Sequence, residues 1–217
     1  MDNDRFRVRN YILSKRMNYL VHFLLAGDDD ELRLGNLLGD FVKGRVDGFA
    51  HPGLTERLRI GIQMHRAIDT FSDRHPAVHR SKRVLTPEYG KLSGVIVDMF
   101  YDHVLARRWP EYHPRPLSVY TQDVYRTLLG NLHRIPAAVH PLVDAMSRGD
   151  WLREYASLRG IERALEGMAA RHPVAAEIAT AGRVLSDHFD HFSSDFDEFL
   201  PDLRARCAEF LAEHEVS

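Results

Sequence analysis

The sequence predicts an all-α protein, and three observations favour this class. Apolar residues recur at helical spacing along most of the 217-residue chain. No window shows the sustained apolar–polar alternation with hairpin turns that is typical of strands. Neither a phosphate-binding glycine motif nor a long-period repeat is present. We therefore expect one domain of about seven to nine helices over residues 17–217, with residues 1–16 as an N-terminal extension.

The first helices follow from apolar runs and acidic caps. Residues 18–25 are apolar, and the sequence GDDDE breaks this run. Asp28 to Asp30 are suited to cap a helix that begins near Glu31, because short acidic side chains accept hydrogen bonds from first-turn amides. That helix is expected to end at Gly44 or Gly48.

The middle of the chain predicts two longer helices. Thr55 is a candidate N-cap for a helix that runs to Asp73 and stops in the Pro76 region. Residues 95–109 form a long apolar helix that carries acidic residues, and three prolines place a loop directly after it.

The C-terminal half continues the helical pattern. Residues 117–133 are amphipathic. Residues 136–173 predict two or three short helices broken at Gly149 and Gly160. Residues 174–214 predict a long helical stretch interrupted at Pro201.

Charge is distributed unevenly, although its total is small. The formal net charge is −2, which gives no sign of nucleic-acid binding. Residues 53–91 contain eight lysines and arginines against four acids, a net of +4. Residues 187–217 contain nine acids against two arginines, a net of −7. A basic middle favours an anionic partner, although oppositely charged solvated helix faces explain the same pattern equally well.

Targeting signals are not recognisable in the sequence. The polar, arginine-rich first residues lack the apolar core of a secretory signal, and either Met1 or Met17 can serve as the start. No apolar run reaches the roughly 18 residues of a membrane span. Cys207 is the only cysteine, which excludes an internal disulfide and a thiolate zinc cluster. We expect a cytoplasmic protein with neither a membrane nor a nucleic acid as its partner.

Three short stretches place carboxylates and imidazoles one helical turn apart. On a helix, residues i and i+4 share a face, so each stretch presents a polar edge to one side. Carboxylate and imidazole without thiolate are suited to hard or intermediate divalent metals. This pattern favours a metal-dependent hydrolase. The stretches contain Asn36 and Asp40; His65, Asp69 and Asp73; and Asp98, Asp102 and His103.

Single polar residues within these helices also have structural interpretations. Asp98 and Asp102 lie in an apolar helix, where an uncompensated carboxylate is costly, so Arg66 or a metal should neutralise them. His22, taken alone, is more often a hydrogen-bonded core histidine than a ligand. His188 lies in a charged run that is more typical of a solvated face. Serine and cysteine nucleophiles have little support, because no nucleophile-elbow motif occurs and Cys207 lacks an adjacent base.

Four segments together resemble the bacterial acyl carrier protein phosphodiesterase family. They are MNYLVHFLLAGDDDELRLGNLLGDFVKG, GIQMHRAIDTFSDRHP, DMFYDHVLARRW and LSDHFDHFSSDFDEFLP, and the resemblance spans residues 17–206. It implies a helical fold like that of HD-domain phosphohydrolases and a Mn²⁺-dependent reaction, with Mg²⁺ or another divalent metal as alternatives. The reaction removes the 4′-phosphopantetheine arm from holo-acyl carrier protein. The adjacent pair Asp102-His103 reverses the usual His-Asp order, so ligand roles cannot be copied by motif.

The positions that match the family pattern receive roles from their chemistry. We expect Arg66 to bind the phosphodiester, His103 to protonate the leaving serine oxygen, and Asn36 to orient water or a ligand carboxylate. The predicted metal ligands are His22, Asp40, His65, Asp69 and Asp102. The predicted catalytic residues are Arg66, His103, Asn36 and Asp98. The predicted substrate-binding residues are Lys43, Arg66, Arg80, Lys82 and Arg83. Asp73 and His188 also match, without an assigned role.

Two other functions remain open at this point. The polar stretches fit an HD-like phosphohydrolase of nucleotides or other small phosphoesters equally well. A non-catalytic helical binding protein is the third possibility, and it would not depend on a metal. Only the resemblance and the basic stretch of residues 53–91 favour holo-acyl carrier protein, which is typically acidic, as the partner.

Overall fold

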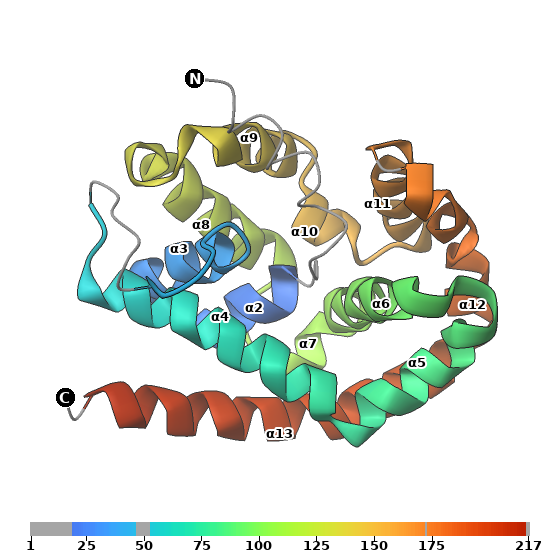
Figure 1. Cartoon of the computed structure of the whole chain (residues 1–217). Helices are drawn as coiled ribbons and strands as arrows, with labels where there is room; N and C mark the ends of the chain where they lie inside the picture. Colours follow the sequence, from blue (N-terminus) through green and yellow to red (C-terminus); the bar gives the residue numbers. More distant parts are fainter. Residues whose placement is uncertain (1–18, 47–52, 172, 216–217) are drawn as a thin grey trace.

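The described part of the chain is built from helices alone, which confirms the all-α prediction (Figure 1). The computed structural model describes residues 19–46, 53–171 and 173–215. Within these ranges the helices outnumber the expected seven to nine, partly because α7 and α10 are single turns. The expected extension over residues 1–16 lies outside the described residues.

The α-helices are labelled in chain order and joined by short 3₁₀ turns. Their bounds are α2 Tyr19–Ala26, α3 Asp30–Gly39, α4 Glu56–Arg74, α5 Pro76–Tyr89, α6 Ser93–Arg107, α7 Trp109–Tyr112, α8 Leu117–Gly130, α9 His140–Arg148, α10 Trp151–Glu154, α11 Leu158–Arg171, α12 Gly182–Asp187 and α13 Phe189–Glu215.

Helix starts agree with the predicted capping residues. The Asp29 side chain accepts a hydrogen bond from the Leu32 amide at 3.0 Å, at the start of α3. Thr55 does the same for the Leu58 amide at 3.1 Å, at the start of α4. Each cap satisfies an amide that has no partner within its own helix.

Several predicted boundaries are wrong, for identifiable reasons. α3 ends at Gly39, before Gly44. By contrast, α4 ends at Arg74, as expected from the Pro76 region, and Pro76 then occupies the first position of the next helix, α5. Gly160 lies inside α11, and Pro201 lies inside α13, which continues through it.

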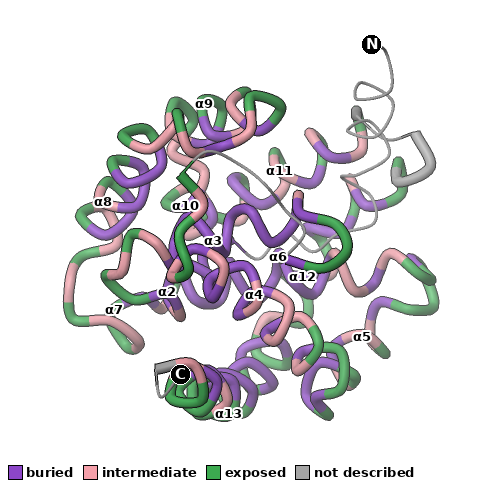
Figure 2. Tube along the Cα trace, turned by 60° about the vertical axis from the view of Figure 1, so that its left-hand side comes forward, coloured by how far each residue is buried: buried purple, intermediate pink, exposed green. Residues whose placement is uncertain are grey.

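Two central helices carry the acidic and histidine motifs into the interior. In α2 every residue except Leu25 is buried, and α6 is buried from Ile96 to Ala106. Figure 2 shows α2, α3 and α6 as the largely buried centre, whereas α9 and α13 expose their outer faces. Polar groups on α2 and α6 must therefore find partners within the protein.

Helices α3 and α4 approach each other unusually closely at a pair of glycines. A β-carbon added to Gly35 would lie 2.5 Å from the Gly61 Cα, which is closer than real side chains approach. The absence of side chains at both positions lets the two backbones touch. This contact fixes the distance between the two helices that carry Asn36 and His65.

Within the described ranges, no helix combines the length and apolar character needed to cross a bilayer.

Candidate metal centre

Three helices bring imidazole and carboxylate groups to one point. Ligand-capable atoms of His22 on α2 and of His65 and Asp69 on α4 all lie within 4.8 Å of one another. His22 Nε2 lies 3.5 Å from Asp69 Oδ1, and His65 Nε2 lies 3.4 Å from Asp69 Oδ2. Asp40, which follows the last residue of α3, places Oδ1 3.5 Å from His65 Nε2. Four of the five predicted metal ligands therefore meet.

The orientation of His22 is fixed by Asn36. His22 Nδ1 lies 3.0 Å from Asn36 Oδ1, and the Asn36 amide nitrogen donates to the Leu32 carbonyl at 3.0 Å. Because the amide oxygen can only accept, His22 Nδ1 carries the proton and donates it to Asn36. In the neutral ring the other nitrogen, Nε2, is then unprotonated, and its lone pair can accept a hydrogen bond or bind a metal.

This lone pair faces a carboxylate. Burial, followed by the proximity of His65, lowers the pKa of His22, which keeps the ring neutral. Nε2 of His22 and both ring nitrogens of His65 are buried and make no hydrogen bond within the described residues. Two acceptors, His22 Nε2 and Asp69 Oδ1, then face each other at 3.5 Å. Such an arrangement is stabilised when a cation lies between them. The donor set fits a divalent metal.

His65 lies between two carboxylates. Burial disfavours its charged form, but Asp40 and Asp69 outweigh burial and raise the pKa of His65 to about 9. Burial raises the pKa of the Asp69 carboxyl, but the two imidazoles outweigh burial and lower this pKa below its ordinary value. Binding of a metal at His65 would therefore require release of the imidazole proton, so metal affinity should depend on pH.

Gly39 provides the room that His65 occupies. A β-carbon at position 39 would overlap the His65 side chain, since its three nearest neighbours would all be ring or β-carbon atoms of that residue. Sequence reasoning missed Gly39, because the contact joins two helices and leaves no local signal.

Asp102, the fifth predicted ligand, has another contact. Its two oxygens accept hydrogen bonds from the backbone amides of Leu20 and Val21, both at 2.9 Å. These amides belong to the first turn of α2, so Asp102 caps the helix that carries His22. Burial raises the pKa of the Asp102 carboxyl, although the two amides favour its charged form. Asp98 is buried one turn earlier on α6, and neither residue belongs to the three-residue group found among the described residues.

His103 points to a different part of the molecule. Its Nδ1 donates to the Tyr155 carbonyl at 2.7 Å, and its ring lies edge-on to Phe189. Burial is the main cause that lowers the pKa of His103 to about 4. His103 lines a cavity of about 190 Å³ next to α11 and α12. Its role as the acid for the leaving group remains a prediction.

The Arg66 side chain forms hydrogen bonds with the loop that follows α3. Its two terminal nitrogens donate to the carbonyls of Val42 and Gly44, each at 2.7 Å. The guanidinium thus holds the loop that begins at Asp40 and carries exposed Lys43. A direct contact between Arg66 and phosphate remains a prediction.

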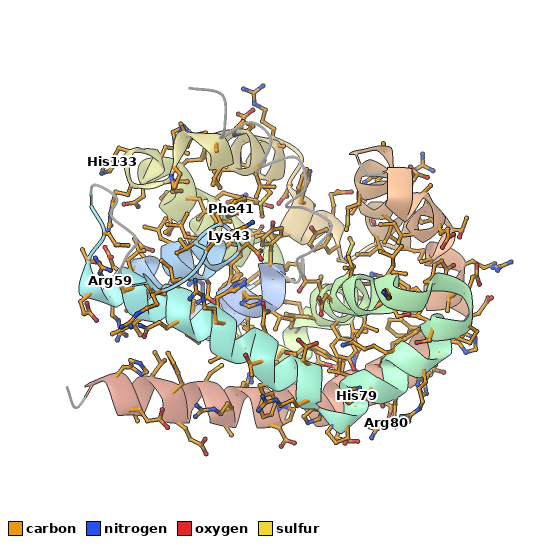
Figure 3. The ribbon with its side chains drawn as sticks, viewed as in Figure 1. Phe41, Lys43, Arg59, His79, Arg80 and His133 are labelled. Atoms are coloured by element: carbon orange, nitrogen blue, oxygen red, sulfur yellow. The ribbon has the colours of Figure 1, made fainter. Side chains whose placement is uncertain are left out.

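The other predicted substrate-binding cations do not form one surface. Arg80 pairs with Asp195 at 2.7 Å and with Glu198, and Lys82 pairs with Asp73 at 3.2 Å. Arg83 is exposed on α5. Figure 3 shows Arg80 on α5, far from Lys43 on the loop after α3. Binding of a substrate by this set remains a prediction. His188, also in the family pattern, is exposed between α12 and α13.

The fold and this centre define an all-α protein with a histidine–carboxylate site of the kind used in metal-dependent hydrolases. The family "Acyl carrier protein phosphodiesterase" matches residues 17–203, so the chain belongs to that family. The acyl carrier protein phosphodiesterase of Yersinia pestis is 33% identical over 186 residues, which cover 85% of this chain and 94% of the relative. That of Serratia proteamaculans is 32% identical over 194 residues, which cover 89% and 98%. No solved structure matches significantly.

Proposed function

We propose that this protein is a metal-dependent phosphodiesterase that removes the 4′-phosphopantetheine arm from holo-acyl carrier protein. The family membership supports the substrate, since the relatives are named for it. The observation that carries the metal dependence is the pair of acceptors, His22 Nε2 and Asp69 Oδ1, which face each other in a buried site.

The proposed ligands are His22, His65 and Asp69, with Asp40 at the edge of the group. A divalent cation such as Mn²⁺ supplies Lewis-acid polarisation of a phosphoryl oxygen and makes water a better nucleophile at neutral pH. The protein's own residues hold this geometry. Asn36 fixes the tautomer of His22, and Asp102 fixes the first turn of α2. Such supporting contacts around metal ligands tune affinity.

Asp69 forms the accessible edge of the proposed centre. Its side chain is 28% exposed, whereas those of His22, His65 and Asp40 are 3–6% exposed. A phosphodiester can therefore approach the centre from the Asp69 side. The buried side, closed by α2 and α3, excludes water from the imidazoles.

The proposal is tested by mass spectrometry of holo-acyl carrier protein incubated with the protein and Mn²⁺. We expect the carrier protein to lose the mass of the whole phosphopantetheine moiety, and chelation to prevent this loss. Asp69→Asn should abolish the reaction and stoichiometric Mn²⁺ binding while the helical circular dichroism is retained. Hydrolysis of nucleotides with an unchanged carrier protein would instead favour a small-phosphoester hydrolase. No metal binding would favour a non-catalytic helical protein.

A further inference from the structure

The cavity beside His103 is separate from the proposed metal centre. Residues of α6, α11, α12 and the start of α13 line it, and none of them belongs to the histidine–carboxylate group. Its volume of about 190 Å³ is below the range of about 300–1,000 Å³ that is usual for ligand pockets, so its ligand must be small. The lining residues are His103, Arg107, Leu158, Leu185, Ser186 and Phe189.

His103 contributes a buried hydrogen-bond acceptor to this cavity. The residue is 1% exposed, and its Nδ1 donates to the Tyr155 carbonyl at 2.7 Å. Since Nδ1 carries the proton of the neutral ring, Nε2 holds a lone pair. Nε2 forms no hydrogen bond within the described part of the chain, and a pKa of about 4 keeps the ring neutral near neutral pH. A donor group on a ligand in the cavity would satisfy this nitrogen.

Arg107 places a positive charge at the same cavity. It follows His103 by one turn of α6, so the two side chains share a face of the helix. The Arg107 guanidinium carbon lies 4.5 Å from the centre of the Phe189 ring, and the centre of the His103 ring lies 5.7 Å from it. Arg107 forms no ion pair with the described acids, including the exposed Asp187 and Asp190 near the lining residues in the sequence. Its charge favours an anion in the cavity and disfavours a metal ion at His103.

We propose that this cavity binds a small phosphate, either the free ion or the end of a phosphate monoester. A hydrogen phosphate group combines charged oxygens with one hydroxyl. The oxygens accept from the Arg107 guanidinium and the Ser186 hydroxyl, and the hydroxyl donates to His103 Nε2. Leu158 and Leu185 provide the apolar part of the wall. A sulfate has no hydroxyl near neutral pH, so it would leave two acceptors facing each other.

Titration calorimetry of the full chain with inorganic phosphate tests this site. The titration is done with Mn²⁺ and without it, because phosphate bound through a metal at His22, His65 and Asp69 would depend on Mn²⁺. Arg107→Gln removes the charge, and Arg126→Gln on α8, also at an exposed arginine, is the matched control. Sulfate is the second ligand, and its comparison with phosphate requires no variant to fold. Glycerol 3-phosphate represents the monoesters.

We expect phosphate to bind the wild type and Arg126→Gln without Mn²⁺, and to bind Arg107→Gln at least about tenfold more weakly. Sulfate should bind the wild type at least about tenfold more weakly than phosphate, because it cannot donate to His103 Nε2. Tighter binding of glycerol 3-phosphate than of phosphate would identify a monoester as the ligand, and the reverse order would identify the free ion. No binding, equal affinities for sulfate and phosphate, or an unchanged affinity in Arg107→Gln would overturn the assignment.

Discussion

The imidazole rings of His22 and His65 lie nearly parallel, with centroids 4.2 Å apart, although they come from different helices. The stack aligns two ring edges towards Asp69, since both Nε2 atoms lie 3.4–3.5 Å from its oxygens. Burial keeps the His22 ring neutral, whereas Asp40 and Asp69 raise the pKa of His65 and so favour its protonated form. The site is therefore organised around a positive charge.

Gly39→Ala is expected to weaken metal binding, although Gly39 is not itself a ligand. The added methyl group would overlap the His65 ring and displace it. We expect Mn²⁺ affinity, measured by titration, to fall at least about tenfold. Gly130→Ala is the matched control, because a β-carbon there meets open space at the end of α8. Equal behaviour of the two variants would contradict the role of Gly39.

The Asp102→Asn variant tests whether Asp102 caps α2 or binds the metal. The amide keeps the shape but has only one accepting oxygen for the amides of Leu20 and Val21. We expect the free energy of unfolding of the metal-free protein to fall by about 1–3 kcal/mol, as measured by urea denaturation. If only metal binding changed and the metal-free stability did not, Asp102 would be a ligand instead.

Arg66→Lys is expected to loosen the loop after α3. Lysine keeps the charge but cannot donate to the Val42 and Gly44 carbonyls together. Hydrogen exchange of the amides in residues 41–46 should speed up, and kcat/KM should fall because Asp40 leads into this loop. A raised KM with unchanged exchange would instead indicate that Arg66 binds phosphate.

His103 should make stability depend on pH below neutrality. Its pKa is about 4 in the folded protein, against an ordinary value of 6.5 when the chain is unfolded. Between these values the unfolded chain binds the extra proton, so the free energy of unfolding rises with pH from about 4 to 6.5. His103→Asn keeps a donor for the Tyr155 carbonyl but does not titrate, so this slope should decrease in urea denaturation series. An equal slope in both proteins would show that His103 does not contribute.

Helix identity and the main polar cluster could be predicted from the sequence, because both depend on local spacing. Caps such as Asp29 and Thr55 act within one turn, and His65 and Asp69 share a face of one helix. The partners of α6 side chains could not be predicted in this way. Asp102 and His103 are adjacent on α6 but face α2 and Tyr155 respectively, and only the packing of distant helices decides this.

The ion-pair partners of the basic residues could not be predicted from the sequence either. Residues 53–91 are basic in sequence, yet Arg80 and Lys82 are matched by acids from α13 and α4. Local charge counts cannot reveal such partners. Arg206, which lines a pocket between α4 and α13, belongs to the acidic end of the sequence and is not among the predicted substrate-binding residues.

The glycine contact between α3 and α4 also limits how this centre can diverge in evolution. Gly35 meets Gly61 backbone to backbone, and Gly39 meets the His65 ring one turn later. Any larger residue along this seam would push the two helices apart and separate Asp40 from His65. Inherited variation along α4 is therefore less restricted on the opposite, outward side, where Thr70 and Arg74 are exposed.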